Sequence, residues 1–196
     1  MKKLIAVALL LCVPEMANAM PQSEEGFTFE GAVNIGTGKM QDKNENVLRR
    51  TMSSLTGSIM TGWRFSGWGV GPTGEYRILY QNTEKTTVGN QNAKGKWWVV
   101  GIGVNKLVDE WLISGALNFW GKYDLDATTL AGKGVAYNRP HGIKIGASRN
   151  IDYNVGAGVF ATWTRFTENQ ISDDTFSINT NKLTYWDVSL AVTYSI

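Results

Sequence analysis

Cysteine, proline and long apolar stretches are all scarce in this chain. Its 196 residues include one cysteine and four prolines. No stretch approaches the roughly 20 apolar residues that a membrane-spanning helix needs, which excludes transmembrane helices. With Cys12 as the single cysteine, no disulfide within the chain can stabilise its fold.

The N-terminus has the pattern of a secretory signal peptide. Lys2 and Lys3 precede an apolar run from Leu4 to Val13, and Ala17-Asn18-Ala19 fits a small-x-small cleavage site. We therefore expect residues 1–19 to be a signal peptide. The remaining residues, 20–196, suffice for one domain, which would reach an oxidising compartment without a cysteine.

Net charge is also small. Removing Lys2, Lys3 and Glu15 with the signal peptide leaves 17 basic and 16 acidic residues, so nucleic acid and other polyanions are not indicated as partners. Glycine and tryptophan, by contrast, are frequent, with 22 and eight copies. In a chain without an obvious long amphipathic helix, this composition favours an all-β protein.

Apolar and polar residues alternate with a period of two in eight segments, as they do in β-strands with two different faces. In the last segment, LTYWDVSLAVTYSI, the apolar face carries Val188, Leu190 and Val192. Several segments run ten residues or more, about what a tilted strand needs to cross a bilayer. The eight segments are residues 26–36, 53–65, 75–81, 96–105, 111–123, 141–148, 153–164 and 183–196.

The connections between these segments alternate in length. Long polar connections take turns with shorter ones, as they do in outer-membrane barrels, where periplasmic turns are short and external loops are longer. The sequence thus predicts an all-β fold, an eight-stranded antiparallel up-and-down transmembrane β-barrel in the outer membrane of a Gram-negative bacterium. The long connections are residues 37–49, 82–95, 124–141 and 167–182; the short ones are 66–74, 105–110 and 149–152.

Aromatic residues gather near the ends of the predicted strands, where amphipathic rings would form belts at the two membrane interfaces. Tyr123 falls on the predicted lipid-facing side of its strand. The opposite face carries mostly small neutral residues, which suit the narrow interior of an eight-stranded barrel. The predicted external belt contains Trp97, Trp98, Phe119, Trp120, Trp163 and Trp186; the periplasmic belt contains Trp63, Phe65, Tyr76, Trp111, Tyr153 and Tyr194.

A few charged residues fall on the inward face, where a low dielectric requires them to be paired. We expect those of the first three strands to form one network towards the periplasmic end, and the other two to meet across the lumen. Such salt bridges could close the barrel; a gate or narrow ion pathway is the alternative. The first group is Glu30, Arg64, Glu75 and Arg77; the second is Lys144 and Asp187.

With its signal peptide, loop pattern and terminal TYWDVSLAVTYSI, the chain resembles the small eight-stranded outer-membrane barrels, such as the membrane domain of outer membrane protein A and the OmpX-like and OmpW-like proteins. The resemblance covers the mature chain and is architectural. It implies insertion by the barrel-assembly machinery, which in that group reads a C-terminal strand ending in an aromatic residue. Here the last residue is Ile196, and Tyr194 stands two places earlier.

Catalytic chemistry is not indicated. Some barrels of this group are enzymes acting on lipopolysaccharide that use a histidine with a serine and an acid. The single histidine, His141, has no serine within several residues, and its parity points it outward. We predict no catalytic residue, cofactor or metal site.

Five basic residues should lie near or beyond the external aromatic belt, where they could bind lipid phosphates, although ordinary loop solvation explains them equally well. They are Lys96, Lys122, Arg139, Arg165 and Lys182. We therefore expect a monomeric, non-enzymatic outer-membrane protein with a structural or surface-interaction role, whose partners are membrane lipids including lipopolysaccharide. The alternatives are a narrow channel, a lipid A-modifying enzyme and a secreted lipocalin-like binder.

Overall fold

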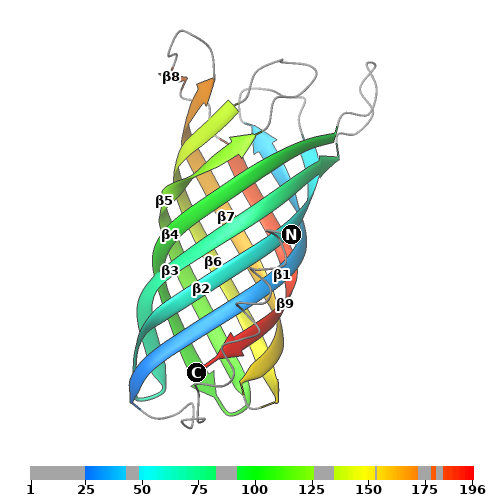
Figure 1. Ribbon diagram of the computed structural model, residues 1–196. Helices are drawn as coiled ribbons and strands as arrows, with labels where there is room; N and C mark the ends of the chain where they lie inside the picture. Colours follow the sequence, from blue (N-terminus) through cyan, green and yellow to red (C-terminus); the bar gives the residue numbers. More distant parts are fainter. Residues whose placement is uncertain are drawn as a thin grey trace, which may run out of the picture.

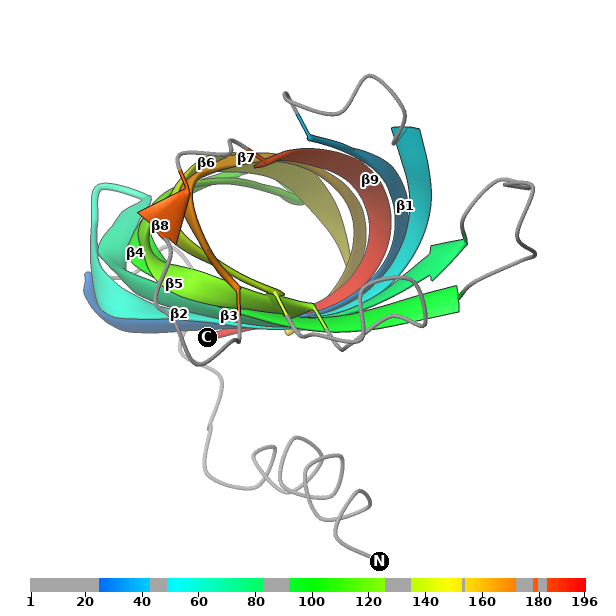
Figure 2. The same cartoon turned by 90° about the horizontal axis from the view of Figure 1, so that it is seen from above.

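Eight antiparallel strands close into a barrel in the computed structural model (Figures 1 and 2). Seven of them each pair with the next barrel strand along the chain, and β9 also pairs with β1, which closes the ring. The structure describes residues 25–42, 49–82, 92–125, 135–152, 154–171, 178–179 and 183–196. The barrel strands are β1 (Gly26–Asp42), β2 (Arg49–Phe65), β3 (Trp68–Asn82), β4 (Asn92–Val108), β5 (Trp111–Leu125), β6 (Val135–Asp152), β7 (Val155–Ile171) and β9 (Leu183–Ser195).

This confirms the predicted fold class, although several strands are longer than their sequence pattern indicated. A two-residue strand, β8 (Ile178–Asn179), pairs with β7 inside the predicted connection 167–182. The predicted signal peptide lies outside the described residues. Among the residues that the structure does describe, no helix has both the length and the hydropathy to cross a membrane.

The third strand begins earlier than predicted. Residues 66–74 were assigned to a turn, but Phe65 already pairs with Trp68, which leaves a turn of two residues. Ser66 and Gly67 both have positive φ, 48° and 76°, as a type I′ hairpin turn requires. The glycines and the proline further on lie within β3, where a side chain on Gly71 would overlap the backbone oxygen of Thr61.

The two faces of the barrel wall differ as the alternation predicts. On β9, Leu190 and Val192 are 70% and 61% exposed, whereas Ser189, Ala191 and Thr193 are buried. Exposed large apolar side chains occur on all eight barrel strands, and the interior combines small neutral residues with buried charges. This is the inverse of a soluble protein and matches a barrel with lipid outside.

Two aromatic residues lie on the opposite face from the one predicted. Trp97, assigned to the external belt, and Tyr123, assigned to the lipid-facing side, are both fully buried inside the barrel. A β-bulge explains Tyr123: Val100 pairs with Trp120 and Gly101 with Asn118, so Phe119 between them is left unpaired. The extra residue inverts the parity of the rest of β5.

Candidate functional site in the barrel interior and at its rim

An arginine on β3 is the centre of the interior polar network. Arg77 pairs with Glu75 on its own strand at 2.7 Å and with Asp187 of β9 at 2.6 Å. It also donates to the hydroxyl oxygens of Tyr185 and Thr162, at 2.9 and 3.3 Å. With its Nε–H also bonded to Glu75, every one of its five N–H donors has an acceptor.

The network reaches the opposite wall through Glu75. Its second carboxylate oxygen accepts a hydrogen bond from Nζ of Lys144 at 3.0 Å, and Lys144 also donates to Ser58. On the other side, Tyr185 and Ser54 both donate to the Asp187 oxygen that Arg77 contacts. Two cations and two carboxylates are thus buried together without net charge.

Glu30 and Arg64 form a second group. Glu30 accepts hydrogen bonds from Asn105 and Ser114, both at 3.1 Å, and Arg64 donates to Thr28 at 2.8 Å. Glu30 and Arg64 also attract each other electrostatically. The six predicted inward charges are all buried. They form two groups rather than the predicted arrangement of one four-residue network and a separate Lys144–Asp187 pair.

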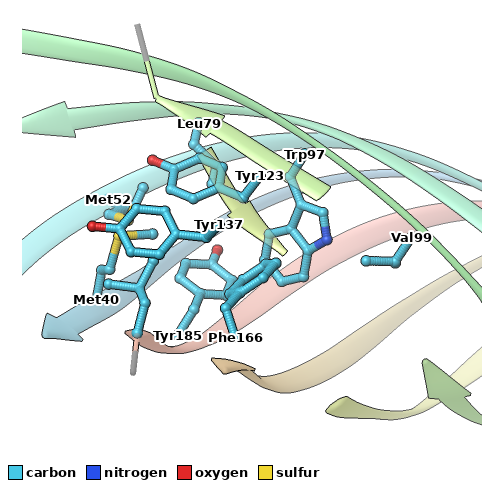
Figure 3. Close-up of a cluster of buried hydrophobic side chains, with 10 residues drawn as sticks. Met40, Met52, Leu79, Trp97, Val99, Tyr123, Tyr137, Phe166 and Tyr185 are labelled. Carbon is cyan, nitrogen blue, oxygen red and sulfur yellow. The ribbon is translucent and has the colours of Figure 1, made fainter. Parts of the chain in front are cut away.

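The interior toward the long connections is filled by apolar and aromatic side chains. Ten buried residues form this aromatic layer, and every barrel strand contributes at least one (Figure 3). The ring of Trp97 lies edge-on to those of Phe166 and Tyr185, 5.3 and 5.1 Å away. The layer consists of Met40, Met52, Leu79, Trp97, Val99, Tyr123, Tyr137, Phe166, Leu183 and Tyr185.

The aromatic layer and the network are in direct contact. The guanidinium of Arg77 lies 4.7 Å from the ring centre of Trp97 and 5.1 Å from that of Tyr185, so it makes cation–π contacts with both. A small cavity of about 40 Å³ remains between Glu30 and Lys144, room for a water molecule or two. Within the described ranges, no cluster of three or more His, Cys, Asp and Glu side chains could hold a metal ion.

The predicted basic residues at the rim divide into paired and unpaired ones. Lys122 pairs with Asp124 at 2.7 Å and Arg139 with Glu168 at 2.8 Å. Lys96 is exposed on β4, Arg165 is half-buried on β7, and neither has an ion pair with a described residue. Lys182 lies outside the described residues.

Two further rim lysines were missed. Lys39 approaches the ring of Trp186 at 6.0 Å, and Lys94 approaches that of Tyr80 at 5.8 Å. Both continue the outward parity of their strands, so extending the period-two pattern by one or two steps would have found them. His141 is exposed on the outer face.

No family model and no curated protein matches the sequence. Among solved structures, the outer membrane enzyme PagL is 12% identical, with 83% of this chain and 98% of that chain covered and a TM-score of 0.52. The attachment invasion locus protein Ail of Yersinia pestis, in complex with the heparin analogue sucrose octasulfate, is 13% identical, with 87% and 100% covered and a TM-score of 0.50. Neisserial surface protein A is 12% identical, with 86% and 96% covered and a TM-score of 0.47.

At these identities, the likeness concerns the fold alone. The chain has the fold of the small eight-stranded outer-membrane β-barrels. That fold includes an enzyme, PagL, as well as an attachment protein, so it does not by itself assign an activity.

Proposed function

We propose that this protein is an integral outer-membrane barrel with a closed lumen and no enzymatic activity, which presents its polar loops at the cell surface in a structural or interaction role. The observation that carries the proposal is the double closure of the interior. The Arg77 network spans the lumen, and the aromatic layer fills the section next to it.

An ion passing through would have to break both closures. The Arg77 guanidinium has no free N–H donor with which to exchange partners, and its charge is already balanced by Glu75 and Asp187. The layer beyond it offers a permeating ion few polar groups, so entering it carries a desolvation cost of several kcal/mol. A static wall is therefore favoured over a narrow channel.

The surroundings of His141 support a non-enzymatic role. Its partner across the β6–β7 ladder is Arg165, and the outward residues next to it on β6 are Arg139 and Ile143. None of these three is a nucleophile or a carboxylate, so they could not complete a hydrolytic triad.

Membrane fractionation tests the placement of the protein. We expect it in the outer membrane after density-gradient separation, with a faster electrophoretic migration when unheated than when boiled. Recovery as a soluble periplasmic protein would contradict the proposal and favour the lipocalin-like alternative.

Planar bilayer recordings test the closure. The purified barrel should produce no conductance steps over a range of voltages. A general porin in the same detergent, recorded alongside as the positive control, should produce them. Regular single-channel steps from the barrel would show that its lumen conducts.

A further inference from the structure

Two adjoining hollows form a furrow on the outer face of the barrel, which crosses β9, β7 and β6 and continues onto β5, β4 and β3. A hollow of about 370 Å³ is lined at one end by Trp163 and Trp186, which are paired across the β7–β9 ladder. A second hollow, of about 580 Å³, shares Ile145 and Ala161 with the first and continues towards the short turns. Because Ala161 lines both hollows, they adjoin at this residue.

Two cations lie beyond the tryptophan end of this furrow. Lys39 is the β1 partner of Trp186 and contacts its ring, and Arg165 follows Trp163 by one outward position. The outward neighbours of these two cations on the described part of the rim are Gln41, Thr184, Thr167 and His141. None of these four is a carboxylate, so the local charge is positive, in contrast to Lys122 and Arg139, which are held by acids.

We propose that this face binds a phosphorylated glycolipid of the outer leaflet, the lipid A portion of lipopolysaccharide. Its phosphates lie on Lys39 and Arg165, and one acyl chain follows the furrow past Trp163 and Trp186 onto Ala161. This assignment rests on the proposed location in an outer membrane and adds a defined lipid partner to it.

The spacing of the cations favours a lipid with two phosphates. Lys39 and Arg165 stand on either side of β9 and are offset by two residues along it, so their Cα atoms are about 12 Å apart by the usual strand spacing and rise. Each can make charge-assisted hydrogen bonds to its own phosphate, whereas phosphatidylglycerol offers a single phosphate. Lipid tails are as apolar as the barrel wall, so the furrow contributes close packing and orientation, and the cations contribute most of the affinity.

Binding can be measured by native mass spectrometry of the barrel extracted from outer membranes, titrated separately with lipid A and with phosphatidylglycerol. We expect tighter binding of lipid A. Lys39→Gln and Arg165→Gln should each weaken it about fivefold, since a basic residue at an anionic lipid surface contributes about 1 kcal/mol.

Matched variants separate this site from general surface charge. Lys94→Gln removes a rim lysine with a similar ring contact on β4, across the barrel from β9, and should change lipid A binding less than twofold. Ala161→Phe fills the furrow and should weaken binding. Ala157→Phe adds the same bulk four residues away on the same outward face, outside both hollows, and should not weaken binding.

Three results would overturn the proposal: equal losses in the Lys39 and Lys94 variants, equal affinity for phosphatidylglycerol, or equal effects of the two phenylalanines. Heat-modifiable migration reports whether each variant is folded, and the charge variants test the site even if Ala161→Phe does not fold. Failure of the outer-membrane placement would appear in fractionation instead, so the two failures are distinguishable.

Discussion

Replacing Arg77 by methionine tests whether the interior network holds the barrel together. The substitution keeps much of the side-chain volume but removes the cation that joins Glu75 to Asp187. Glu75 retains Lys144, whereas Asp187 keeps the hydroxyl donors of Tyr185 and Ser54 and loses its ion pair.

The expected cost is about 3–5 kcal/mol, the usual result of removing one partner of a buried ion pair. A Coulomb estimate agrees, since two unit charges about 4 Å apart interact by about 4 kcal/mol at an effective dielectric constant of 20. Removing the stranded charge as well, in Arg77→Met/Asp187→Asn, should recover a large part of the loss, because the interior is again electroneutral.

The measurement is reversible urea unfolding in lipid vesicles, with the folded fraction read from gel migration without boiling. Arg149→Met is the matched control: Arg149 also donates twice to a carboxylate, that of Glu110, but their side chains are 60% and 65% exposed. Its loss should cost less than about 1 kcal/mol. If Arg77→Met were as mild as this control, or if Asp187→Asn made it worse, the network would not stabilise the fold.

Three further predictions concern the wall. Leu190→Arg places a charge on the outer face of β9, where Leu190 is 70% exposed, and should lower the unfolding free energy by about 2–4 kcal/mol in the same assay. A loss below about 1 kcal/mol would argue against lipid on this face. Gly71→Ala should abolish the heat-modifiable band because its Cβ would overlap the Thr61 backbone, whereas Gly57→Ala, with open space around it, should fold normally. Cells that overproduce the wild-type protein and cells that overproduce His141→Ala should give the same lipid A mass spectrum. A mass change in lipid A that appears with the wild-type protein and is lost with the variant would reveal an enzyme.

The architecture could be predicted because its signal is local. Strand alternation places Leu190 and Val192 outward and Ser189 inward without knowledge of any partner strand, and the burial of these residues agrees. Trp97 shows a local signal that was overlooked. In a regular strand without a bulge, two consecutive residues cannot both face lipid, so with Trp98 outward, Trp97 is expected to point inward.

The inward orientation of Tyr123 could not be predicted from the sequence. Phe119 and Trp120 are both exposed because the ladder with β4 skips one residue between Val100 and Gly101. A bulge of this kind depends on how two strands pair, so the sequence of either strand alone does not predict it. Since the side-chain period is two, one unpaired residue moved the rest of β5 to the opposite face and brought Tyr123 into the aromatic layer.

The ion pairs illustrate the same limit within the site. Burial in a narrow barrel requires that Asp187 have a cation, and that requirement follows from its parity alone. The identity of the cation depends on the stagger of the strands around the barrel, which brings Arg77 across the lumen to a residue 110 positions away. Lys144, which was expected to meet Asp187 across the lumen, instead pairs with Glu75. The inward charges of a barrel sequence therefore predict that the interior is electroneutral, and the three acids and three bases here satisfy this. Which acid pairs with which base depends on the register of the strands around the barrel.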